Sequence, residues 1–135
     1  MRSRETLIRM QRFQVDEKRR DVAQIEAMIA DFEAKETDLH NQIEAEQERA
    51  GIFDVTHFAY PTFAKAALAR RDNLRASIGG LERRLEDARE SLADTVSELK
   101  RLELLDERED RTRRAETAHV EQRELDEVGA AMHRG

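Results

Sequence analysis

Histidine and carboxylate side chains are the groups in this chain that could bind a metal or transfer a proton. The sequence has no cysteine. The histidines have no spacing that would place two zinc ligands on one helical face with a carboxylate between them. The many acidic residues alternate with Arg and Lys, as on solvated helix faces. We therefore expect no catalytic residue, no metal site, no cofactor and no enzyme. The four histidines are His40, His57, His119 and His133.

An aromatic stretch, GIFDVTHFAYPTFAK, is the second candidate and covers residues 51–65. It holds the only proline, and it has no charged residue from Val55 to Ala64, although 40% of the chain is charged. One interpretation is a small cap, in which three phenylalanines (53, 58 and 63) fold over the ends of neighbouring helices. The other is a cap that also presents a protein-binding surface. For that surface we predict Phe53, Phe58, Tyr60 and Phe63.

Arginines form the third candidate. Residues 1–20 carry seven Arg or Lys against three Asp or Glu, and three more arginines cluster at 111–114. One interpretation is a solvated helix end. The other is docking onto an acidic partner or a nucleic acid, and for a protein contact we predict Arg2, Arg4, Arg9, Arg12, Arg111, Arg113 and Arg114.

Two helical arms would have to position these residues. Apolar residues spaced three and four apart favour a coiled coil, because this spacing keeps one stripe facing a partner helix. The first arm has Ile8, Val15, Val22, Ile25, Ile29, Phe32, Leu39, Ile43 and Ala50 on one track, interrupted by Lys18 and Glu36. The second arm has Ala64, Ala67, Leu74, Ile78, Leu81, Leu85, Ala88, Leu92, Leu99 and Leu102, with Arg71 and Thr95 between them.

A short connection between the arms favours an antiparallel hairpin. Gly51 is suited to end the first helix as a left-handed cap, and Pro61 suits the first turn of the second. Two residues then face each other when their numbers add up to about 111. The sequence predicts an all-α fold, an antiparallel two-helix coiled-coil hairpin with an extended C-terminal helix. We expect residues 1–135 to form one domain, with helices at about 4–50 and 61–130 and a turn at 51–60.

Two further expectations follow from this register. Residues 106–135 have no partner within the hairpin, so this polar tail either frays or is covered by a partner. Gly79 and Gly80 face the region of Phe32, where they either relieve crowding or form a soft point.

Because Phe58 and Tyr60 lie outside the heptad tracks, we expect their replacement by alanine to leave the hairpin folded.

Composition excludes several classes of protein. The net charge of −6 argues against a nucleic-acid-binding protein. No apolar run reaches about 18 residues, the length typical of a membrane span. The hydrophobic fraction of 39% is rich in alanine and lacks tryptophan, so the chain is not expected to build a thick globular core.

Two parts of the chain resemble the FliJ family of flagellar export proteins, in its alphaproteobacterial variety. The start, SRETLIRMQRFQVDEKRRDVAQIEAMIADFE, is similar to the family's opening of short-spaced apolar residues among arginines. The segment ELKRLELLDERED followed by EQRELDEVGA is similar to the charged C-terminal helix of the family. The resemblance covers nearly the whole chain.

The resemblance implies a stalk and adaptor of the flagellar type III export apparatus that is not an enzyme. Implied partners are the export ATPase, the cytoplasmic part of the export gate and export chaperones. No nucleic acid is implied, and membrane association is expected only through partners. The implied location is the cytoplasm at the inner-membrane base of the flagellum. From the residues themselves, and not from a family motif, we predict that the arginines contact the ATPase and that the aromatic turn contacts the gate.

Two other functions are consistent with the residues alone. A generic coiled-coil scaffold would self-associate, with its tail helical through self-pairing. A weak nucleic-acid-associated helical protein would use its basic first turns, and its binding would depend steeply on salt.

Overall fold

The computed structural model describes residues 2–134, with side chains from residue 3 onward. Within them the chain forms α1 (Arg2–Ala50) and α2 (Thr62–Arg134), and no strand. It divides into two units. The loop unit is Asp16–Ala93, and the terminal unit comprises Met1–Val15 and Asp94–Gly135. Both helices contribute to both units. That residues 1–135 form one domain stays a prediction.

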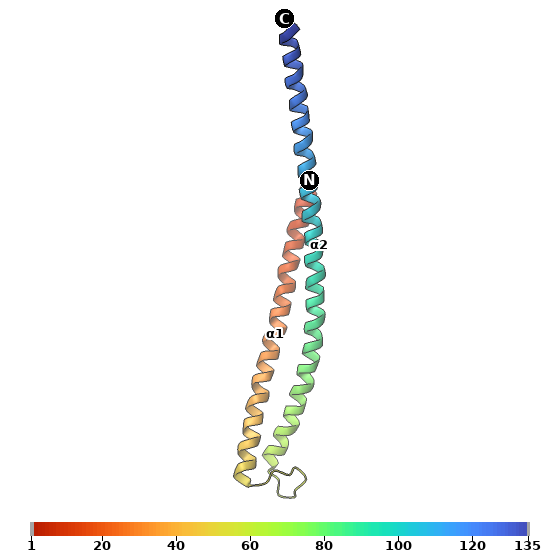
Figure 1. Ribbon diagram of the computed structural model, residues 1–135. Helices are drawn as coiled ribbons and strands as arrows, with labels where there is room; N and C mark the ends of the chain where they lie inside the picture. Colours follow the sequence, from red (N-terminus) through yellow and green to blue (C-terminus); the bar gives the residue numbers. More distant parts are fainter. Residues whose placement is uncertain (1, 135) are drawn as a thin grey trace. The chain divides into compact units, whose positions relative to one another are not determined.

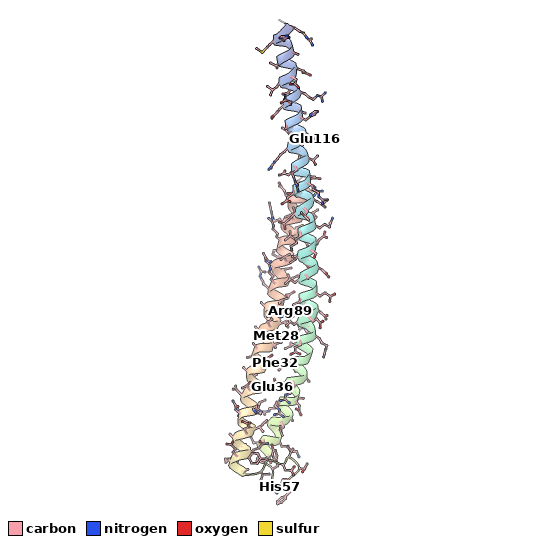
Figure 2. The ribbon with its side chains drawn as sticks, viewed as in Figure 1. Met28, Phe32, Glu36, His57, Arg89 and Glu116 are labelled. Carbon is pink, nitrogen blue, oxygen red and sulfur yellow. The ribbon has the colours of Figure 1, made fainter. Side chains whose placement is uncertain are left out.

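In the loop unit, α1 and α2 run antiparallel, side by side, and the loop at 51–61 joins them (Figure 1). The core consists of residues from the two predicted heptad tracks, which confirms that these tracks face each other. Phe32 reaches this core from α1 (Figure 2). The buried members are Ile25, Ile29, Ile78 and Leu81, and Phe32, Leu85 and Ala88 pack against them.

Ion pairs between the helices show the register of the loop unit. Arg75 Nε donates to Glu36 Oε1 at 2.6 Å, and the residue opposite position 75 in the predicted register is position 36. Arg89 lies 3.8 Å from Glu26. These pairs are solvent-exposed and each contributes roughly 0–1 kcal/mol, so apolar burial rather than charge holds the helices together.

In the terminal unit, the first turns of α1 pack against residues 94–109 of α2. Ile8 and Val15 are buried there, and Gln11 Nε2 donates to the Thr95 carbonyl at 3.0 Å. Side chains from 107 to 134 are all exposed, and the last part of α2 continues without a second helix beside it (Figure 1). The predicted hairpin with an extended C-terminal helix is therefore confirmed.

The loop begins and ends at its glycine and proline. Gly51 has φ of 70°, and the N–H groups of Gly51 and Ile52 donate to the Gln47 carbonyl at 2.8 and 3.3 Å, which confirms the left-handed cap. Helix α2 begins at Thr62, so Pro61 precedes the helix instead of lying in its first turn. Its carbonyl accepts the Lys65 N–H at 3.0 Å and starts the helical hydrogen bonds.

Gly79 and Gly80 do not relieve crowding against Phe32, so that interpretation is wrong. A Cβ atom at either position would meet only the Arg83 guanidinium, at 3.9 and 3.8 Å, which is ordinary van der Waals contact. Both glycines lie inside α2 without a positive φ. Replacing either by alanine should raise the free energy of unfolding by about 1 kcal/mol, because alanine has the higher helix propensity.

Thermal unfolding followed by circular dichroism measures this effect, and Gly51→Ala is the control. The same substitution at Gly51 should lower stability by about 1 kcal/mol, because an L-residue is strained at a positive φ. If Gly79→Ala and Gly80→Ala also destabilised the protein, the glycines would have a packing role that these contacts do not show.

Candidate protein-binding surfaces

The aromatic loop is held in shape by its own polar groups. Asp54 Oδ1 accepts the Thr56 N–H at 2.9 Å and the Thr56 hydroxyl at 2.7 Å. These bonds lower the pKa of the Asp54 carboxyl, and the nearby His57 adds to the effect. The carboxylate therefore supports the turn at neutral pH, and this support is lost as the pH falls through the lowered pKa.

His57 continues the same network and fixes the most exposed ring. Its Nδ1 accepts the Ala59 N–H at 3.0 Å, and its carbonyl accepts the Tyr60 N–H at 3.1 Å. The imidazole stacks on Phe58 with ring centroids 4.7 Å apart. Phe58 is nevertheless 95% exposed, so stacking orients this ring without covering it.

Tyr60, and not the phenylalanines, closes the loop. Tyr60 is only 8% exposed, and its hydroxyl accepts a hydrogen bond from Gln47 Nε2 at 2.9 Å. Phe53 and Phe63 are 62% and 51% exposed. The expected cap of three phenylalanines is therefore wrong, and Tyr60 does not offer its ring to a partner. The surface that could contact a partner consists of Phe53 and Phe58 of the loop and Phe63 of the first turn of α2, and we call it the phenylalanine surface.

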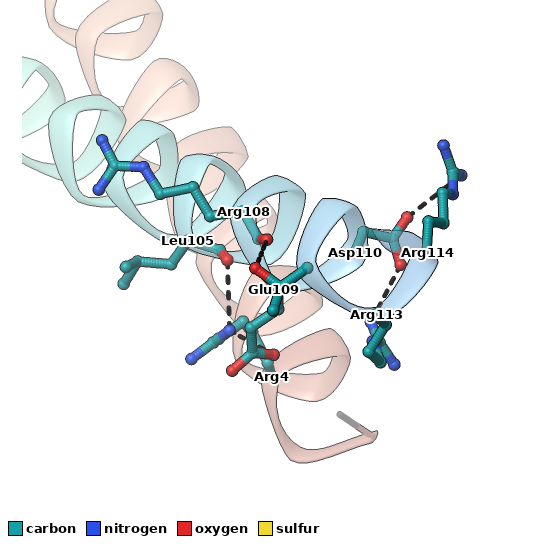
Figure 3. Close-up of polar contacts among 8 residues, drawn as sticks. Arg4, Leu105, Arg108, Glu109, Asp110, Arg113 and Arg114 are labelled. Carbon is teal, nitrogen blue, oxygen red and sulfur yellow. Dashed lines mark hydrogen bonds and ion pairs between the residues drawn. The ribbon is translucent and has the colours of Figure 1, made fainter. Parts of the chain in front are cut away.

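The predicted arginines divide into those used inside the fold and those left on the surface. Arg4 crosses to α2, where Nη1 lies 2.6 Å from Glu109 Oε2 and 3.4 Å from the Leu105 carbonyl (Figure 3). Arg12 lies 3.4 Å from Glu103. Both hold the start of α1 against α2. Arg9 is exposed, and the side chain of Arg2 lies outside the described residues.

The predicted arginines of α2 pair with carboxylates of their own helix. Arg113 and Arg114 both approach one carboxylate, that of Asp110, at 3.0 and 3.4 Å (Figure 3). Arg111 lies 3.9 Å from Glu107, at the edge of ion-pair distance. The side chains of Arg111 and Arg114 are nevertheless 73% and 80% exposed.

The sequence did not predict that Arg108 lies beside the predicted arginines. A shallow groove in the terminal unit brings Arg4 of α1 next to Arg108 and Arg113 of α2, and Leu105, Glu109 and Thr112 complete its lining. In the sequence Arg108 stands between two glutamates and looks like an ordinary solvated charge. Applying the hairpin register to Arg4 would have indicated this region, because position 4 faces about position 107.

The described residues contain no group of three or more His or acidic side chains that could hold a metal ion. In the same part of the chain, neither helix has a stretch apolar enough to cross a membrane. The two surfaces offer guanidinium groups at one and phenyl rings at the other.

Comparison with known proteins agrees with the resemblance seen in the sequence. Searches of curated proteins and of solved structures found no match. A family model described as flagellar FliJ protein matches residues 3–135, which is essentially the whole chain. The chain therefore belongs to the FliJ family, whose members are components of the flagellar export apparatus.

Proposed function

We propose that this protein is a non-enzymatic stalk and adaptor of the flagellar type III export apparatus. It binds the export ATPase through the terminal unit and the export gate through the phenylalanine surface, and it also binds export chaperones. It acts in the cytoplasm at the inner-membrane base of the flagellum, and it reaches the membrane only through its partners.

One observation carries the ATPase contact: α2 continues with every side chain from 107 to 134 exposed. An isolated polar helix is marginally stable in water, and a surrounding protein would stabilise it. The same unit presents the exposed guanidinium groups of Arg111 and Arg114. An acidic surface on the ATPase would attract these groups and would also increase the rate of association.

The gate contact is supported by the phenylalanine surface. Scattered apolar residues are normal on a surface, but three exposed phenyl rings on the loop and the first turn of α2 are the kind of group that anchors an interface. The backbone of the loop is already bonded to its own residues, so little hydrogen bonding with water would be lost on binding.

Reversing the charge of Arg113 and Arg114 tests the ATPase contact. The double variant Arg113→Glu, Arg114→Glu should weaken binding to the purified export ATPase by about tenfold or more, because each substitution replaces attraction by repulsion. Titration calorimetry or surface plasmon resonance gives the affinity, and circular dichroism checks that helix content is retained.

A matched control exists in the same helix. Arg83 and Arg84 are also consecutive exposed arginines, but they belong to the loop unit. Arg83→Glu, Arg84→Glu should bind the ATPase as the unaltered protein does. Equal weakening by both double variants would show that only net charge matters. Absence of binding by the unaltered protein would refute the proposed ATPase contact.

A further inference from the structure

The terminal unit exposes two apolar stripes that face away from its own helix contacts. On α1, Leu7, Met10 and Phe13 are 51%, 58% and 58% exposed, whereas Ile8 and Val15 fill the contact with α2. Residues three apart lie near each other on a helix, so these three side chains form one stripe along its surface. We call it the α1 stripe.

The second stripe lies on the unaccompanied end of α2. Leu125, Val128 and Met132 are 65%, 56% and 77% exposed, and their spacing of three and four places them on one face. Glu121 and Glu124 border this face and line a shallow groove with Leu125 and Val128. We call it the α2 stripe. Like the α1 stripe it has three apolar members, but its spacing is three and four instead of three and three.

The two stripes carry opposite charge. Arg9, next to the α1 stripe, is exposed, whereas Arg4 and Arg12 pair with Glu109 and Glu103 of α2. Residues 116–134, around the α2 stripe, contain five acidic and two basic residues. Two α2 stripes would repel each other, and so would two α1 stripes. An α1 stripe and an α2 stripe attract, because an apolar centre then meets an apolar centre and a basic border meets an acidic one.

We propose that the partner of each stripe is a second copy of this chain. In a symmetric dimer the α2 stripe of each copy packs on the α1 stripe of the other, so both stripes of both copies are covered at once. Two-fold symmetry is the commonest symmetry of soluble oligomers, and it satisfies this reciprocal arrangement.

The helix directions allow this contact. Within one copy the start of α1 is antiparallel to α2, as the contacts of Gln11 with Thr95 and of Arg12 with Glu103 show. If the dimer axis sets the two α2 helices antiparallel, the α2 end of one copy runs parallel to α1 of the other. Leu7 and Met10 then meet Leu125 and Val128 of the second copy, since both pairs are three residues apart.

This dimer is independent of the proposed ATPase contact, although it occupies the same unit. It would cover residues on which that contact depends, so the ATPase and a second copy would compete for the terminal unit. A failure of dimerisation would leave the ATPase proposal unchanged, and the two are measured separately.

Mass measurement of the full chain tests the dimer. Light scattering or sedimentation at rising micromolar concentration should show a species of twice the 15.7 kDa chain mass. Met10→Glu should return the protein to a monomer, and so should Leu125→Glu, because each buries an unpaired charge in the contact. Val120→Glu is the matched control, since Val120 is 50% exposed on a different face of α2 and should leave the dimer intact.

Cysteine cross-linking then identifies the contact. The chain has no cysteine, so introduced thiols are the only ones present. A mixture of the Met10→Cys and Val128→Cys variants should give a disulfide-linked pair, and a mixture of Met10→Cys with Val120→Cys should not. A chain that stays monomeric at all concentrations would overturn the proposal. So would a dimer that Met10→Glu and Leu125→Glu leave unchanged.

Discussion

Replacing Leu81 with alanine should lower the free energy of unfolding of the loop unit by about 2–5 kcal/mol. Leu81 is 6% exposed and packs with Ile25, Ile29 and Ile78 between α1 and α2. Within residues 2–134 no second layer of helices stands behind this contact to close a cavity, so both helices lose packing. Chemical denaturation followed by circular dichroism gives the difference.

Leu104 provides the matched control for this substitution. Leu104→Ala makes the same chemical change in the same helix, but Leu104 is 52% exposed. Its effect should stay within about 0.5 kcal/mol, as for other surface substitutions. A similar loss for both variants would mean that leucine contributes through helix propensity, and the assignment of the core would then be wrong.

The heptad spacing was sufficient to predict the hairpin and its core. Ile25, Ile29, Ile78 and Leu81 lie on tracks that repeat over many turns, and only one face of each helix is apolar enough to be covered. The loop length then determined the register, which the Arg75–Glu36 pair matches. The sequence can predict these contacts because, in a helix, the spacing between two residues determines whether their side chains lie on the same face.

Which aromatic ring closes the loop could not be predicted in the same way. The loop has no repeating backbone geometry, so spacing does not indicate direction. Tyr60 turns inward because its hydroxyl finds Gln47, whose carbonyl also caps α1. Phe58 has no polar atom to satisfy and is oriented by His57 instead. The position of Tyr60 depends on a residue 13 positions away in the sequence. The position of Phe58 depends on the geometry of a non-helical turn.

The ion-pair partners of the arginines could not be predicted from the sequence either. Arg4 and Arg113 look alike in the sequence, yet Arg4 bridges two helices and Arg113 belongs to a local cluster around Asp110. The register predicts which part of α2 lies opposite Arg4. It does not predict which acidic side chain is rotated toward it, because that depends on the position around the helix axis.

Tyr60→Ala should destabilise the loop unit by about 3 kcal/mol, as expected for the loss of a buried aromatic ring. This reverses the expectation from the sequence that its replacement leaves the hairpin folded. The ring is 8% exposed, and removing it also leaves the side-chain amide of Gln47 without its hydroxyl partner. Tyr60→Phe keeps the ring and loses only the hydrogen bond, so its cost should be about 1 kcal/mol.

Phe58→Ala separates stability from binding at the same loop. Phe58 is 95% exposed, so its removal should change the free energy of unfolding by no more than about 0.5 kcal/mol. Binding to the cytoplasmic part of the export gate should nevertheless weaken by about tenfold, because an exposed aromatic anchor is lost. Thermal unfolding and calorimetric titration of the same preparation measure both quantities. Unchanged gate binding with a stable fold would show that the phenylalanine surface has no role in that contact, and a large loss of stability would show that Phe58 supports the loop as Tyr60 does.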